Sequence, residues 1–206
     1  TPRASAGHWS GLQELRALRA ALSAPLRAAI GPGQRTLKPE EPPNGTKRSS
    51  PVQLRANVIS SGLDEYAAIF IPGGHGAMNV IPFDKDVQTA LDHFLNNDKL
   101  IITLCHGPAS LLAGSIGRDS NPFSGHKITA FPDSLDFGAN LDIGYLPGEM
   151  PWRLGEALKK EGVEIINDDM AGTTTSDRNL LTGDSPLAAN QLGKDAVTAL
   201  LARFGN

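Results

Sequence analysis

The pattern of apolar and polar positions changes character near residue 61. From there to the C-terminus, short runs of β-branched and aliphatic residues alternate with segments whose apolar residues recur every three or four positions. The first pattern predicts strands, at 66–71, 99–104, 127–130, 163–166 and 179–182. The second predicts helices, at 84–97, 107–113, 152–161 and 185–204. Strands that alternate with helices predict an α/β domain, residues 61–206, with a parallel sheet covered on both faces.

Residues 1–60 follow a different pattern. Ser10 and Gln13 form a capping box that begins one amphipathic helix, whose leucines form a single stripe. Residues 31–51 are rich in Pro, Gly, Lys and Ser and lack apolar periodicity, which predicts a loop or disorder. The segment carries nine basic and three acidic residues, a net charge of +6, whereas the whole chain carries −3. We therefore expect a basic, partly disordered N-terminal segment.

The start of the chain has two interpretations. An Arg-rich, acid-poor amphipathic segment is typical of an organellar transit peptide. A chain that begins at Thr1 rather than Met is more simply explained as a fragment or an altered amino terminus. The Asn44-Gly45-Thr46 sequon is a chance match in either case.

Composition narrows the class of protein. A net charge of −3 predicts no general affinity for nucleic acid, and no apolar stretch is long enough to cross a bilayer. One cysteine cannot form an internal disulfide. We therefore expect a cytoplasmic protein without nucleic-acid or membrane partners.

That single cysteine lies where a predicted strand meets a predicted helix. Leu104-Cys105-His106-Gly107 ends the apolar run, and Pro108 follows within the first turn of the helix. Such a turn resembles a nucleophile elbow, and the helix N-terminus is expected to lower the thiol pKa below its ordinary value of about 8.5. The alternative is that Cys105 is a small buried apolar residue.

Three loops are expected to converge at the carboxyl edge of the sheet, where parallel sheets bind ligands. They are Gly73-Gly74-His75-Gly76, Cys105-His106 and Phe131–Asp136. The glycine-rich turn lets backbone N–H groups approach a substrate oxygen, so Gly73, Gly74 and His75 are candidates for an oxyanion or substrate site. Its spacing fits neither the dinucleotide fingerprint nor the P-loop, and the remaining alternative is a plain tight turn.

Six motifs occur in order between Asp64 and the C-terminus. They are Asp64-Glu65-Tyr66-Ala67-Ala68-Ile69-Phe70-Ile71-Pro72-Gly73-Gly74-His75-Gly76, Leu104-Cys105-His106-Gly107-Pro108, Ala130-Phe131-Pro132-Asp133, Gly144-Tyr145-Leu146-Pro147-Gly148, Ile165-Ile166-Asn167-Asp168-Asp169 and Leu180-Leu181-Thr182-Gly183-Asp184-Ser185-Pro186. This series resembles the PfpI-type superfamily with its flavodoxin-like fold. Within that superfamily it is similar to the HchA branch of heat-shock chaperones and glutathione-independent glyoxalases.

The resemblance implies a chemistry and assigns roles. It implies Cys105 as nucleophile, His106 as its partner and Asp136, in preference to Asp133, as the acid that orients the histidine. It implies a glyoxalase III-type lyase, a D-lactate dehydratase that detoxifies methylglyoxal, with deglycase activity as a variant. Such an enzyme needs a small aldehyde and no redox cofactor, because oxidation at one carbon balances reduction at the next. The alternatives are a stress-response holdase that binds unfolded clients, and a catalytically impaired fragment.

The chain departs from the family upstream of Asp64. Members carry there the first strands of the sheet, a glutamate that contacts the sulfur and, in the HchA branch, a metal site. None is recognisable here, because Glu14, Glu40, Glu41 and His8 stand in unrelated patterns. We therefore expect an altered or incomplete sheet, no metal, and self-association through the exposed sheet edge, most simply a homodimer.

Other conspicuous residues are expected to have structural roles. We expect His93 and His126 at the surface rather than on a metal. Asp168 and Asp169 are expected to cap or turn the chain after a strand, and Trp152 to anchor its helix in the core.

Overall fold

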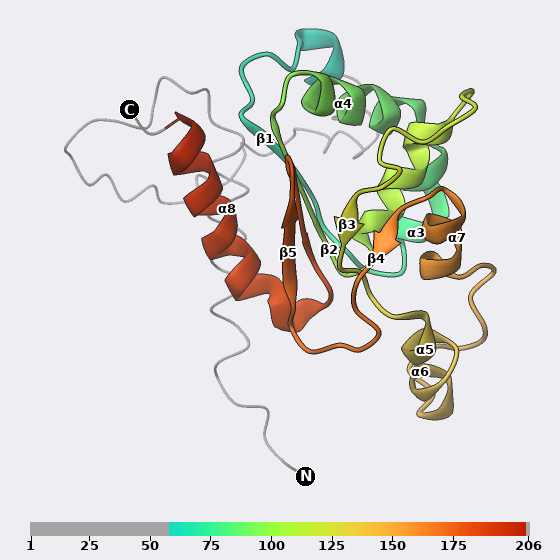
Figure 1. The fold of residues 1–206 in the computed structure, drawn as a ribbon. Helices are drawn as coiled ribbons and strands as arrows, with labels where there is room; N and C mark the ends of the chain where they lie inside the picture. Colours follow the sequence, from blue (N-terminus) through green and yellow to red (C-terminus); the bar gives the residue numbers. More distant parts are fainter. Residues whose placement is uncertain (1–57, 205–206) are drawn as a thin grey trace, which may run out of the picture.

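The computed structural model describes residues 58–204, which form an α/β fold around a four-stranded sheet (Figure 1). The strand order is β1-β2-β6-β5, with β1 at Ala68–Ile71, β2 at Leu100–Leu104, β5 at Thr174–Asp177 and β6 at Leu180–Gly183. β1, β2 and β6 are parallel, whereas β5 runs antiparallel to β6. The predicted parallel sheet with helices on both faces is confirmed.

Two of the predicted strands form a separate small sheet. β3 (Lys127–Ile128) and β4 (Glu164–Ile165) are shorter than predicted and pair in parallel with each other. Thr129 joins them to the main sheet, because its backbone N–H donates to Thr182 Oγ1 at 2.9 Å. The small sheet therefore lies next to β5 and β6 without joining their hydrogen-bonded order.

Helices cover both faces of the main sheet (Figure 1). On one face lie α3 (Ala77–Val80), η2 (Ile81–Phe83), α4 (Lys85–Asn96), the 3₁₀ helix η3 (Gly107–Ser115) and α7 (Leu154–Lys160). On the other face, η4 (Pro186–Ala188) leads into α8 (Ala189–Phe204). The Ser185 side chain begins this last segment by accepting a hydrogen bond from the Leu187 N–H.

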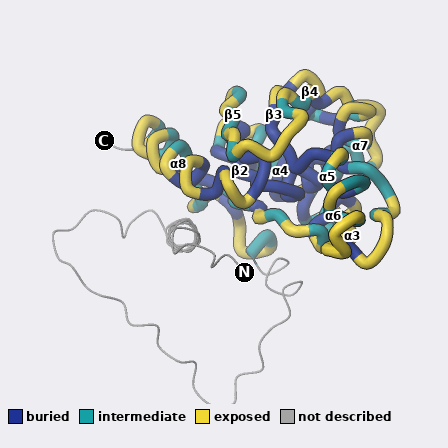
Figure 2. The backbone as a smooth tube through the Cα atoms, turned by 90° about the horizontal axis from the view of Figure 1, so that it is seen from below, coloured by how far each residue is buried: buried dark blue, intermediate teal, exposed yellow. Residues whose placement is uncertain are grey.

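The two faces of the sheet bury two apolar clusters, which the alternation along β2 explains. Ile101 packs with Leu91 and Phe94 of α4, whereas Leu100 and Ile102 pack on the α8 side. Successive strand residues point to opposite faces, so a strand covered on both sides is apolar at every position. Figure 2 shows the result, a buried centre with exposed positions along the outer side of α8.

Two short helices lie beyond the carboxyl ends of the strands. They are α5 (Asp133–Asp136) and α6 (Ala139–Asp142). Asp133 fastens α5 to α7, because its carboxylate accepts hydrogen bonds from the backbone N–H groups of Gly155 and Glu156 at 2.9 and 3.1 Å. This is an N-terminal cap for α7 supplied by another element.

Several expectations are corrected. The strand β5 was not predicted, and the helix that follows Cys105 is a 3₁₀ helix. His126 is buried rather than at the surface, and its Nδ1 lies 3.1 Å from the Phe123 carbonyl oxygen. The ring is held there by apolar packing against Phe123.

The other expectations for isolated residues have mixed outcomes. Asp168 and Asp169 lie in an exposed bend after β4, and Trp152 is half-buried against the main cluster just before α7. The predicted N-terminal helix, the 31–51 loop and the altered part of the sheet lie outside the described residues. Within residues 58–204, no helix is long and apolar enough to cross a membrane.

Candidate active site

Cys105 occupies a sharp turn at the end of β2. Its φ is +61°, in the left-handed region that side chains other than glycine rarely adopt. The turn is fixed on two sides: the Cys105 N–H donates to the Gly183 carbonyl at 2.8 Å, and the Phe131 N–H donates to the Cys105 carbonyl at 3.0 Å. Strained backbone that is over-determined in this way is typical of a nucleophile elbow.

The glycine-rich loop after β1 is fitted against this turn. A Cβ added to Gly73 would lie 2.4 Å from the Leu104 carbonyl oxygen and 2.6 Å from Cys105 Cβ. Gly74 has a φ of +107°, which requires glycine. The loop therefore lies directly against the cysteine, as the convergence of strand ends predicted.

The cysteine, a histidine and an aspartate form a hydrogen-bonded chain. Cys105 Sγ lies 3.2 Å from His106 Nδ1, and His106 Nε2 lies 2.7 Å from Asp136 Oδ2. All three residues are buried. The Phe131 ring stacks on the imidazole of His106, with centroids 4.6 Å apart, and holds its plane.

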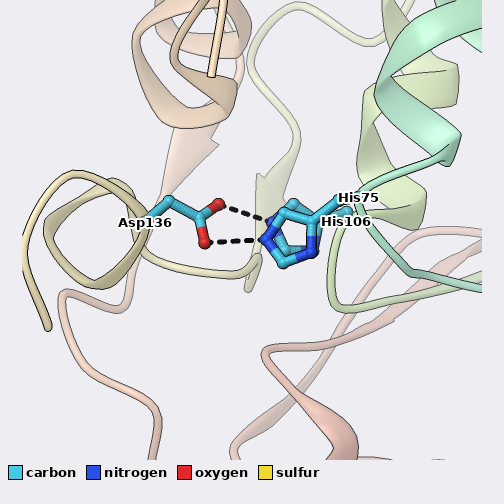
Figure 3. A group of neighbouring side chains, drawn as sticks. All are labelled: His75, His106 and Asp136. Carbon is cyan, nitrogen blue, oxygen red and sulfur yellow. Dashed lines mark hydrogen bonds and ion pairs between the residues drawn. The ribbon is translucent and has the colours of Figure 1, made fainter. Parts of the chain in front are cut away.

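A second histidine shares the same carboxylate (Figure 3). His75 Nε2 lies 2.9 Å from Asp136 Oδ1, and Asn140 Nδ2 donates to that oxygen at the same distance. The two imidazole centroids are 4.2 Å apart. The candidate acid is therefore Asp136 by position, since Asp133 is engaged in capping α7.

The protonation states follow from these contacts. Burial alone raises the pKa of Asp136, but the hydrogen bonds from His106, His75 and Asn140 outweigh it and lower that pKa to about 2. The carboxylate is thus ionised at neutral pH and accepts an N–H from each imidazole. Each histidine then presents its Nδ1 as the unprotonated nitrogen when the ring is neutral.

The expected low thiol pKa is wrong. Burial raises the pKa of Cys105 from 9.0 to about 11, although backbone N–H groups of His106 and Gly74 act in the opposite direction. The carboxylates of Asp136 and Asp184 raise it further. The cost of burying the thiolate outweighs its stabilisation by backbone N–H groups at the start of the helix. The resting residue is therefore a thiol.

A metal would have to compete with this hydrogen-bond network. His75, His106 and Asp136 offer ligand atoms within 4.8 Å of one another, the only such group in residues 58–204. In the structure these atoms bind each other. His93 and His126 do not join the group.

The six predicted site residues therefore come together at one place, from the loop after β1, the turn after β2 and α5. His75 differs from its predicted environment, because its ring faces Asp136. Asn140 was missed, because an asparagine four residues after Asp136 carries no distinctive motif. Asp136 ends α5 and Asn140 lies in α6, so their contact depends on how the chain turns between the two helices.

The chain is similar to a known protein family and to curated proteins. The model of the DJ-1/PfpI family matches residues 28–199. The protein/nucleic acid deglycase HchA of Staphylococcus aureus strain Newman is 50% identical over 163 residues, which cover 78% of this chain and 56% of that protein. The chain thus spans little more than half the length of this curated relative.

Solved structures share the fold. Glyoxalase III from Candida albicans has a TM-score of 0.55 at 25% identity, with 68% of this chain and 60% of that chain covered. Drosophila melanogaster DJ-1beta has a TM-score of 0.50 at 21% identity, with 71% and 61% covered. The family match begins at residue 28, upstream of the predicted boundary at residue 61, which stays a prediction.

Proposed function

Because the chain belongs to the DJ-1/PfpI family and links Cys105, His106 and Asp136 by hydrogen bonds, we propose that it is a glutathione-independent glyoxalase. Its substrates would be α-oxoaldehydes such as methylglyoxal, and its products hydroxy acids such as lactate. The observation that carries the proposal is the continuous contact from thiol to imidazole to carboxylate. The names of the similar proteins, a deglycase and a glyoxalase III, support the substrate class.

The first step is addition of sulfur to the aldehyde carbon. Because the resting thiol is protonated, His106 Nδ1 removes its proton as the carbon–sulfur bond forms. Asp136 stabilises the resulting imidazolium through the 2.7 Å hydrogen bond. The oxygen of the adduct then takes up that proton and gives a hemithioacetal.

The second step moves a hydrogen between two carbons. The hemithioacetal carbon loses its proton, and the neighbouring carbonyl carbon gains one. The product is a thioester, which water cleaves to the hydroxy acid and the free thiol. One carbon is oxidised and its neighbour reduced, so the sequence consumes only water.

Deglycase activity is a variant of the same chemistry. An aldehyde that has added to an amino or guanidino group can be transferred to the sulfur, and the later steps are unchanged. The S. aureus relative carries this activity in its name. A larger substrate would enter on the side of the partly exposed His75.

A glutathione-free methylglyoxal assay tests the proposal. The wild-type chain is compared with Cys105→Ser, and lactate is measured directly. We expect lactate from the wild type and none above background from Cys105→Ser. Equal rates in both proteins would contradict a role for the sulfur.

An exposed apolar stripe favours a second candidate function. Val197, Leu201 and Phe204 lie on one side of α8 and are 47%, 63% and 44% exposed. Spacings of four and three residues place them on one helix face, as a holdase surface for unfolded clients requires. Cys105→Ala separates the two functions, because it abolishes aldehyde turnover and leaves suppression of client aggregation intact.

A further inference from the structure

We propose that His75 is a second proton-transfer group of the site, which moves the hydrogen between the two substrate carbons while His106 serves the thiol. This inference rests on the proposed glyoxalase function and assigns a separate base to the step that moves hydrogen between the two carbons.

The hydrogen bonds make the two imidazoles equivalent toward Asp136. Each ring donates its Nε2–H to a different oxygen of the same carboxylate, at 2.9 Å from His75 and 2.7 Å from His106 (Figure 3). Each ring is thereby fixed in the tautomer with a basic Nδ1. The site therefore holds two bases oriented by one anion.

The surroundings of the two rings differ. His106 is closed in: its side chain is 1% exposed, and its Nδ1 is occupied by the sulfur. The side chain of His75 is 23% exposed, and within residues 58–204 its Nδ1 makes no hydrogen bond. The basic nitrogen of His75 is therefore not already paired with the thiol, whereas that of His106 is.

The distances place His75 close enough to act on the adduct. Its ring centroid is 4.2 Å from that of His106, which itself contacts the sulfur. The backbone of Gly74, the residue before it, lies close enough to the sulfur to lower the pKa of Cys105 against the effect of burial. The His75 ring thus lies next to the imidazole that contacts the sulfur, on the loop that packs against Cys105.

The step balances without a further reactant. His75 Nδ1 takes the proton of the hemithioacetal carbon, and the freed electron pair forms the carbon–carbon double bond of an enediolate. The imidazolium returns that proton to the neighbouring carbon. The hydroxyl proton of the first carbon passes to the oxygen of the second, which leaves the thioester.

The experiment compares His75→Gln with Asn140→Ala. Glutamine keeps an N–H donor for Asp136 and lacks a basic nitrogen, whereas Asn140→Ala removes another donor to the same oxygen and leaves both bases. Methylglyoxal with deuterium at the aldehyde carbon is the probe. Adduct on Cys105 is followed by intact mass spectrometry and lactate by NMR.

We expect His75→Gln to form the adduct within a few-fold of the wild-type rate and to make lactate roughly 100-fold more slowly, the lower end of the range for general acid–base catalysis. Its deuterium isotope effect on lactate formation rises above that of the wild type, whereas Asn140→Ala leaves the isotope effect unchanged. Lactate formation by His75→Gln within tenfold of wild type would overturn the inference, as would a parallel loss of adduct and lactate. A wild type that forms no lactate would instead overturn the proposed function, and the inference with it.

Discussion

The pH dependence of Cys105 alkylation tests how burial and local dipoles combine at the elbow. Burial raises the pKa of this thiol from 9.0 to about 11. Two pKa units correspond to roughly 2.7 kcal/mol of preference for the neutral thiol in the folded chain. At pH 7 the thiolate is then present in on the order of 10⁻⁴ of the molecules, about 100-fold less than at an unperturbed site.

Iodoacetamide labelling measures this directly, because Cys105 is the chain's one cysteine. We expect the logarithm of the rate to rise by about one unit per pH unit until about pH 11 in the folded protein. In denaturant, the labelling rate of the same chain should reach its plateau near pH 9. Burial also lowers the labelling rate at every pH, because it limits access of iodoacetamide to the sulfur. The pH at which the rate levels off, rather than the rate itself, therefore decides the test.

The sign of the linked stability change follows from the raised pKa. Because the folded chain binds the thiol proton more tightly, Cys105 adds to the free energy of unfolding in full below the pKa of the unfolded chain. This contribution is lost between about pH 9 and about pH 11. Circular dichroism across this range shows whether the chain remains folded, and Cys105→Ala should lose less stability there. A plateau at or below pH 8.5 in folded protein would refute the reasoning, because the Gly74 and His106 N–H groups would then outweigh desolvation.

Two matched pairs of variants test the remaining geometry. Asp136→Asn is expected to lower kcat by two to four orders of magnitude with a small change in Tm, because it loses the charge that orients and stabilises the imidazole. Asp133→Ala should keep kcat and lower the free energy of unfolding by about 1 kcal/mol, because it removes the cap of α7. If Asp133→Ala lowered kcat and Asp136→Asn lowered only Tm, Asp133 rather than Asp136 would be the acid of the site. Gly73→Ala should lower both Tm and turnover, because its Cβ meets backbone at 2.4 Å, whereas Gly76→Ala, with a φ of −59° and open space, should change neither. Equal effects at the two glycines would argue against close packing at the elbow.

The sequence predicts most of the sheet and the two loops, at Gly73 and Cys105, that meet at the site. Apolar runs place β2 and β6, and the order of strand ends brings Gly73 and Cys105 together. β5 is missed because Thr174–Asp177 is polar and half-buried, with no alternation to detect. Its place in the fold comes from pairing with β6.

Properties that depend on three-dimensional surroundings are less accessible from sequence. The thiol pKa was predicted from one helix end, whereas in the structure the sum of desolvation and two carboxylates decides it. His126 carries no mark of burial, because the apolar contacts around it come from the fold. The sharing of Asp136 by two histidines likewise arises from a contact between residues 61 positions apart.

Asp136 reaches the site from a segment that contributes few buried residues to the fold. In α5 only Asp136 is buried, and α6 buries none of its residues, so few apolar contacts hold this segment to the sheet. Segments of this kind open locally at a free energy well below that of global unfolding. We therefore expect the proposed activity to be lost on heating before the fold melts. The temperature at which activity disappears would then report on residues 133–142 rather than on the stability of the domain.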